Sequence, residues 1–180
     1  MKKTVHKYKG GPWPWCLDLG LGNRRNPLYS LYYDEQAGSG LLIDTPAIDA
    51  KGRFLWCTKA KKLRHVHEKV VKKLARLGIT TQMTGRIHVG AALKCLDSDT
   101  DDTRGWEALA LLNIVLDYLY FLPNDAEDQK TIRLLEDLSC HIFEGKDLPL
   151  FYVSHDTNTR HVRQLILYSL YRIFENSRIL

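Results

Sequence analysis

The sequence lacks the cysteine patterns and the long hydrophobic runs that mark metal modules, disulfide scaffolds and membrane spans. Its four cysteines lie about forty residues apart with no CxxC pair, which excludes a zinc module of the usual spacing and a dense disulfide framework. The most hydrophobic run, residues 108–122, is fifteen residues long and contains Asn113 and Asp117. It is too short and too polar to span a bilayer and predicts a buried helix. Because residues 1–9 also contain no apolar signal segment, we expect reduced thiols and a cytoplasmic protein without a membrane contact.

Metal-binding and nucleotide-binding motifs are missing too. The segment LGLGNRRN, residues 19–26, matches neither the Walker pattern nor GxGxxG, and a turn explains its glycines. His65 and His67 point about 160° apart on a helix and cannot share one ion. The acidic run 97–102 has Asp102 where a calcium loop requires glycine, so a helix cap is favoured over a weak surface cation. The sequence therefore predicts no metal and no cofactor.

No catalytic constellation can be assembled from neighbouring residues. Ser154, His155 and Asp156 are adjacent along one backbone, where three side chains cannot converge as a catalytic triad requires. One alternative is a general base at His155 or His161 that acts with Asp156 or a distant carboxylate, but no other pattern in the sequence supports it. We expect a protein that is not an enzyme.

The strand, turn and helix signals in the sequence predict one α+β domain over residues 1–180, with a small N-terminal antiparallel β-meander followed by a bundle of about five helices. The β-rich part covers residues 1–57, where glycine turns separate strand candidates at 27–34, 41–44 and 53–57. The helical part covers residues 58–180, and the short Pro123-Asn124 connection makes two of its helices antiparallel neighbours. We expect helices at 59–77, from Thr84 to Leu96, from Asp102 or Thr103 to Pro123, from Asn124 or Asp125 to Gly145, and from Thr157 or Thr159 onwards.

The first of these helices carries most of the positive charge. Residues 59–77 contain eight bases and one acid, a net charge of +7, while the whole chain has +5. At 100° per residue the apolar positions form one stripe. The bases form a continuous flank that we take as a candidate binding surface, made of Lys61, Lys62, Lys69, Lys72, Lys73 and Arg76.

Three interpretations of this basic segment compete. It can grip the phosphates of a nucleic acid, it can dock an acidic protein surface, or it can be a solvated face that pairs with acidic residues of this chain. Residues 78–180 contain ten bases and fifteen acids, so an internal partner is available. The absence of aromatic residues from the segment counts against the binding of single-stranded nucleic acid.

A second candidate contact lies near the N-terminus, where Trp13, Arg24 and Arg25 accompany several tyrosines. Trp, Tyr and Arg dominate the hot spots of protein interfaces. We therefore predict a non-catalytic protein-binding module that docks an acidic partner surface, by analogy of type with inhibitors such as toxin-neutralising immunity proteins, whose partner is a toxin or effector domain. The alternative is a nucleic-acid-associated protein that contacts phosphates through residues 59–77.

Overall fold

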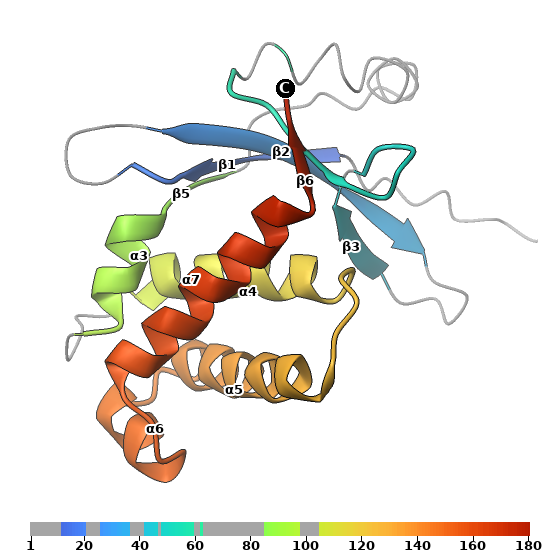
Figure 1. The fold of residues 1–180 in the computed structure, drawn as a ribbon. Coiled ribbons are helices and arrows are strands. Elements are labelled where there is room, and N and C mark those ends of the chain that lie inside the picture. Colours follow the sequence, from blue (N-terminus) through green and yellow to red (C-terminus); the bar gives the residue numbers. More distant parts are fainter. Residues whose placement is uncertain are drawn as a thin grey trace, which may run out of the picture.

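The computed structural model describes residues 12–20, 26–36, 42–46, 48–59, 62, 85–97 and 105–180. The strands form a four-stranded sheet in the order β3-β2-β1-β5 and a two-stranded sheet of β4 and β6, and the described helices lie between β5 and β6 in the sequence (Figure 1). The first three strands pair antiparallel, β5 runs parallel to β1, and β4 runs parallel to β6. The strands are β1 (Pro12–Asp18), β2 (Pro27–Gln36), β3 (Leu42–Pro46), β4 (Phe54–Trp56), β5 (Gly85–His88) and β6 (Ser177–Ile179).

Five helices of the described residues lie on one side of the four-stranded sheet (Figure 1). The predicted α+β class, with a small strand region followed by a helical bundle, is therefore confirmed. No described helix combines the length and the hydrophobicity needed to cross a membrane. The helices are α3 (Val89–Cys95), α4 (Gly105–Leu119), α5 (Ala126–Phe143), α6 (Leu148–Ser154) and α7 (Thr159–Glu175).

The antiparallel meander exists, and two of its three strands, β2 and β3, lie where strands were predicted. The sequence suggested strands at 27–34, 41–44 and 53–57, whereas the meander consists of β1, β2 and β3. Residues 54–56 instead pair with the C-terminal strand β6, and an isolated bridge from Cys57 to Tyr29 joins them to β2. The two prolines of β1 are accommodated in a strand.

Two helix ends follow the local signals in the sequence. Asp125 caps α5 by accepting hydrogen bonds from the backbone amides of Glu127 and Asp128, and Asp128 returns the contact in a capping box. Past the end of the same helix, Gly145 adopts a φ of 68°, a left-handed conformation that suits glycine. Both the predicted start and the predicted stop of α5 are confirmed.

Three other elements correct the sequence-based prediction. Residues 85–88 were predicted to be helical, but they form β5 because they pair with β1. Helix α6 was missed because its seven residues are too few to show a helical period. The last helix does begin at Thr159, but its cap is Asn158, which accepts a hydrogen bond from the amide of His161, rather than Thr157 or Thr159.

The centre of the core joins both sheets to α4 through aromatic residues. Trp56 stacks on Tyr118 with ring centroids 5.2 Å apart, and Phe54 meets the edge of Tyr118 at 4.6 Å. The Tyr118 hydroxyl donates to Ser30 Oγ at 3.0 Å, which in turn donates to the Leu55 carbonyl at 2.8 Å. Aromatic packing and a buried chain of hydrogen bonds therefore fix α4 against β2 and β4.

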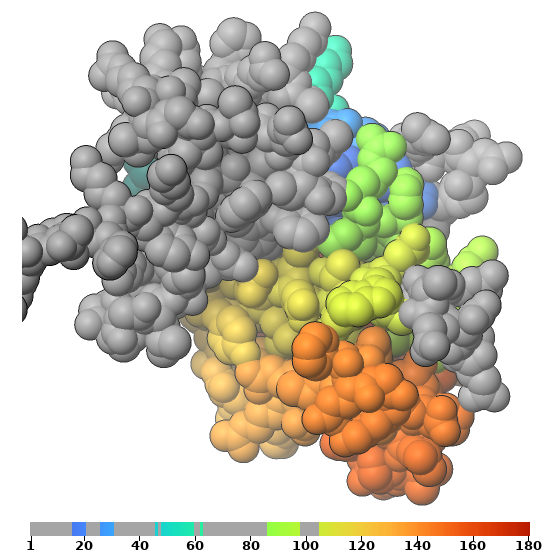
Figure 2. All heavy atoms as spheres, turned by 180° about the vertical axis from the view of Figure 1, so that it is seen from behind, coloured from blue at the N-terminus to red at the C-terminus, as the bar shows by residue number. Residues whose placement is uncertain are grey.

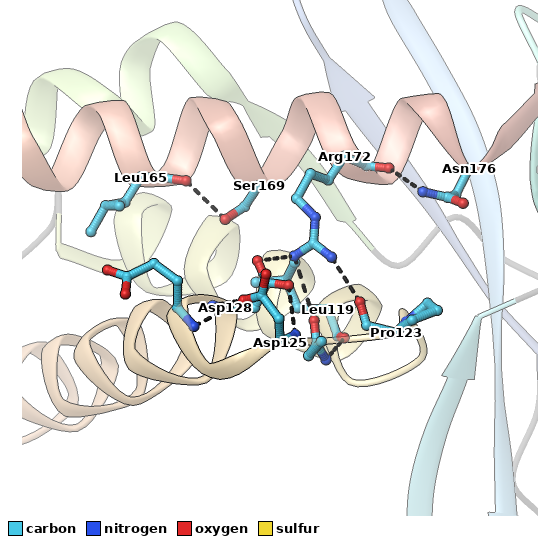
Figure 3. A network of polar contacts seen from close by, with 10 residues as sticks. Leu119, Pro123, Asp125, Asp128, Leu165, Ser169, Arg172 and Asn176 are labelled. Atoms are coloured by element: carbon cyan, nitrogen blue, oxygen red, sulfur yellow. Dashed lines mark hydrogen bonds and ion pairs between the residues drawn. The ribbon is translucent and has the colours of Figure 1, made fainter.

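A charged side chain ties α7 to the connection between α4 and α5 (Figure 3). One terminal nitrogen of Arg172 lies 2.7 Å from Asp128 Oδ1, and the other donates to the Pro123 carbonyl at 2.8 Å. Both partners of the ion pair are largely buried, with side-chain exposures of 19% and 15%. The other carboxylate oxygen of Asp128 accepts from the Asp125 amide, so one residue both caps α5 and holds α7.

Candidate functional site

Most residues of the predicted basic surface lie outside the described part of the chain. Lys62 is the exception, and it is exposed. Burial raises the pKa of the Cys57 thiol, and the positive charge of Lys62 offsets part of that rise, which places Lys62 beside the end of β4. The predicted contacts on which the structure is silent are Lys61, Lys69, Lys72, Lys73, Arg76, Arg24 and Arg25.

The N-terminal candidates can be located only in part. Trp13 belongs to β1, where its backbone pairs with Tyr32. Gly20 and Asn26 flank the segment that holds Arg24 and Arg25, and both donate backbone hydrogen bonds to Asp18 Oδ1, at 3.0 and 2.9 Å. A buried carboxylate therefore fixes both ends of the glycine-rich connection between β1 and β2.

Ser154, the last residue of α6, and His155, which follows it, do contact one another. The carboxylate that faces this histidine is that of Asp137 and not that of its neighbour Asp156. Ser154 Oγ lies 2.9 Å from His155 Nδ1, and His155 Nε2 lies 3.6 Å from Asp137 on α5. The same Ser154 hydroxyl also donates to the Phe151 carbonyl, and the histidine ring stacks on Phe151 at 4.1 Å. These contacts secure the end of α6 against α5, and the group is exposed rather than enclosed.

A polar cluster that the sequence could not reveal lies on the outer face of the four-stranded sheet. Register places Cys16 opposite Arg86 and Asp18 opposite His88 on the parallel pair β1–β5, while Tyr29 lies opposite Cys16 on β2. Alternation along each strand turns these five side chains away from Leu17, Leu28 and Ile87, which pack in the core. We call Cys16, Asp18, Tyr29, Arg86 and His88 the sheet-face cluster.

Asp18 is the buried acid of the sheet-face cluster, with an exposure of 3%. Burial alone would raise the pKa of its carboxyl group, but hydrogen bonds from the Asn26 and Gly20 amides and the charges of His88 and Arg86 outweigh that effect and lower the pKa. Its second oxygen, Oδ2, faces His88 Nδ1 at 3.5 Å. Asp18 is thus held as a carboxylate that orients the histidine.

An apolar groove runs along the seam of α4 and α5, which lie side by side at the surface in Figure 2. Its hollow has a volume of about 290 Å³. Trp106, one helical turn before Leu109, is 65% exposed, and Phe143 is 71% exposed. The hollow is lined by Leu109, Asn113, Ser139, Cys140, Phe143 and Glu144. We call these residues and Trp106 the α4–α5 groove.

Two polar contacts join α5 to α4 and to the residue that follows it. Tyr120, two turns after Asn113, donates its hydroxyl to Glu136 on α5. Burial, and then the hydrogen bond and charge of Glu136, raise the pKa of Tyr120 to about 12, so the hydroxyl keeps its proton in ordinary buffers. In the second contact, Ser139 Oγ donates to Asn113 Oδ1 at 2.9 Å, which joins the two walls of the α4–α5 groove.

Comparison with known proteins finds no match for this chain among family models, curated proteins or solved structures. Its function therefore has to be inferred from its own surface and chemistry.

The charge of the chain divides into two unlike parts. Residues 105–180, which form α4 to α7 and β6, contain seven bases and eleven acids, a net charge of −4, so residues 1–104 carry +9. The α4–α5 groove follows this pattern, because Glu144 belongs to its lining and Asp117 and Glu136 lie at helical spacing from the lining residues Asn113 and Ser139. The groove is therefore apolar at its floor and acidic at its borders.

The outer face of α7 exposes a further apolar strip. Leu167, Tyr168 and Tyr171 are each at least half exposed and follow one another at helical spacing. The charge of Glu175 and its hydrogen bond to Tyr171 raise the pKa of that tyrosine. The helical spacing of this strip and of the groove can be seen in the sequence, but which faces stay uncovered depends on how the helices pack.

Proposed function

We propose that this protein is a non-catalytic protein-binding module that uses the α4–α5 groove as a contact surface. The observation that carries the proposal is the strongly exposed Phe143 in the lining of a hollow between α4 and α5, together with the strongly exposed Trp106 one helical turn before the lining residue Leu109. Isolated exposed apolar residues are common on monomers, but aromatic residues gathered around a concave surface mark interaction sites.

The size and charge of the groove favour a helical partner over a small molecule. A hollow of about 290 Å³ lies below the roughly 300–1,000 Å³ of small-molecule pockets and suits a few inserted side chains. An amphipathic helix docks in such a groove through apolar residues spaced three and four apart. Because Glu144 lines the groove and Asp117 and Glu136 lie at helical spacing from its lining residues, the segment that fits is an amphipathic helix with basic flanks.

The sequence prediction of an acidic partner surface concerns a different part of the chain. The basic segment 59–77 supplies the net charge of +7 that would steer such a surface towards the protein. One partner can contact both the α4–α5 groove and the basic segment 59–77 if it carries a basic region for the first and an acidic region for the second. In its specific form, the proposal is that this protein is a cytoplasmic inhibitor that neutralises a toxin or effector domain.

The test is site-specific photo-crosslinking in the cells from which the protein comes. A photoreactive phenylalanine analogue at Phe143 should give a defined adduct with one protein, and Trp106→Ala should remove at least about nine-tenths of it, since a hot-spot tryptophan contributes more than 2 kcal/mol. The same analogue at Leu167 on α7 is the matched control. Adduct of equal yield at both positions, or adduct that survives Trp106→Ala, would contradict the proposal.

Nucleic-acid binding through residues 59–77 is distinguished by fluorescence anisotropy with labelled RNA and duplex DNA at about 50 and 200 mM salt. The protein-binding proposal expects no binding even at the lower salt concentration. Binding that weakens steeply with salt and disappears in a Lys62→Glu, Lys69→Glu and Lys73→Glu triple variant would give the nucleic-acid function precedence.

A further inference from the structure

The strand β5 presents an arginine and a histidine on the face of the sheet that lies opposite the core residues Leu17 and Ile87. Arg86 and His88 are two residues apart, so their side chains leave the same face with Cα atoms about 6.6 Å apart. We propose that Arg86 and His88 form a binding site for a phosphoryl group, with Asp18, Cys16 and Tyr29 as the residues that position them. This site is separate from the α4–α5 groove and does not depend on the function proposed for it.

The backbone of Arg86 is held by its pairing with Cys16 on β1, and its side chain is exposed to solvent. Register places its side chain on the face that it shares with Cys16 and Tyr29, and interactions with these two neighbours raise the pKa of the guanidinium group. Cys16 is fully buried, whereas Arg86 is exposed. A guanidinium group has five N–H donors in a planar fork, so two such contacts leave donors for an oxyanion from solvent.

His88 is held in a similar way by Asp18. The 3.5 Å contact between His88 Nδ1 and Asp18 Oδ2 turns Nδ1 inward, and the histidine side chain is still 46% exposed. Nε2 lies on the opposite side of the ring and therefore points away from the carboxylate. It can donate to a phosphate oxygen when the ring is charged, or accept from a protonated phosphate when the ring is neutral.

The carboxylate of Asp18 does not take the place of the ligand. Its Oδ1 accepts the two amide hydrogen bonds from Gly20 and Asn26, and its Oδ2 faces His88, so both oxygens are engaged within the protein. With 3% exposure, the carboxylate presents almost no surface to solvent. The two basic side chains of the sheet-face cluster, those of Arg86 and His88, both reach solvent.

Arg86 and His88 together fit a phosphoryl group better than a carboxylate. The arginine fork can bind either anion through two parallel hydrogen bonds. A carboxylate has only two oxygens, which the fork alone can satisfy, whereas a phosphoryl group has a third oxygen and a second charge for His88. His88 therefore adds a contact for a phosphoryl ligand that a carboxylate bound to the arginine fork does not need.

The proposal is tested by titrating the whole chain with inorganic phosphate, sulfate or acetate at matched ionic strength. Binding is followed in ¹H–¹⁵N spectra through the Arg86 Nε–H and the His88 ring signals. We expect saturable shifts of these signals with phosphate and weaker binding of acetate. Shifts that do not saturate, or acetate binding as tight as phosphate, would overturn the assignment.

Variants separate specific binding from general charge effects. Arg86→Gln should weaken phosphate binding about tenfold, the effect of losing a charge-assisted contact. The affinity of Arg86→Lys should lie between those of the native protein and Arg86→Gln, because lysine keeps the positive charge but lacks the planar fork of donors. Arg178→Gln, at an exposed arginine on β6, is the matched control and should leave the affinity unchanged. Equal losses in Arg86→Gln and Arg178→Gln would show that only net charge matters.

The positioning role of Asp18 is tested through His88. Asp18→Asn should weaken phosphate binding in the native chain but add nothing to the loss already caused by His88→Gln, because Asp18 acts through that ring. A merely structural role would lower thermal stability and phosphate affinity to the same degree in both backgrounds. That second pattern would remove Asp18 from the site.

Discussion

Trp56→Ala is expected to lower the free energy of unfolding by about 3–5 kcal/mol, the usual loss when a fully buried tryptophan is truncated. Trp56 is only 2% exposed, stacks on Tyr118 and lies 5.5 Å from the ring of Phe174. Its indole N–H also donates to Ser177 Oγ at 3.2 Å. The substitution therefore leaves a cavity where β4, α4, α7 and β6 meet. Urea denaturation followed by circular dichroism measures the change.

Trp106→Ala is the matched control, since it removes the same side chain from a site that is 65% exposed. We expect its unfolding free energy to stay within about 0.5 kcal/mol of the native value. Trp56→Phe should lie between the two, because it keeps an aromatic ring against Tyr118 but loses the hydrogen bond to Ser177. A loss below about 1 kcal/mol for Trp56→Ala would mean that Trp56 is not at the centre of the core.

Arg172→Ala is expected to cost about 2–3 kcal/mol of stability, more than an exposed ion pair contributes. Removing the guanidinium leaves the Asp128 carboxylate, 15% exposed, without its opposite charge, and the Pro123 carbonyl without its donor. Arg172→Lys should recover only part of the loss, because a single ammonium group cannot reproduce the two-pronged contact. Thermal and urea unfolding of the three proteins give the comparison.

Lys130→Ala provides the control for Arg172, because Lys130 also forms an ion pair on α5. Its partner is Glu127, and the two side chains are 73% and 78% exposed. Solvent screens such pairs, so the variant should unfold like the native protein. Equal effects at positions 130 and 172 would show that the contact between α7 and the α4–α5 connection contributes little.

Local signals in the sequence were sufficient for both ends of α5 and failed where distant segments decide the structure. The start of α5 at Asp125 and its end at Gly145 follow from capping chemistry that neighbouring residues contain. Residues 85–88 form a strand because β1 offers a hydrogen-bonding edge, and nothing near them in the sequence shows that edge.

The same limit applies to the candidate sites. Asp18 and His88 are separated by seventy positions, and only the parallel register of β1 and β5 brings them to one face. The helical spacing of Trp106 and Leu109 is visible in the sequence, and the short connection at Pro123 correctly suggested that α4 and α5 are antiparallel neighbours. Which side of that pair stays open follows from the packing of α7, which the sequence alone does not fix.

The pairing of β4 with β6 sets an order of events during synthesis. Trp56 and Ser177 are 121 positions apart, and at about 5–20 residues per second the ribosome needs on the order of 10 s to make the stretch between them. During that time β4 has been made, but its ladder partner has not. The nascent chain must therefore keep Phe54, Leu55 and Trp56 from associating with other chains until β6 emerges.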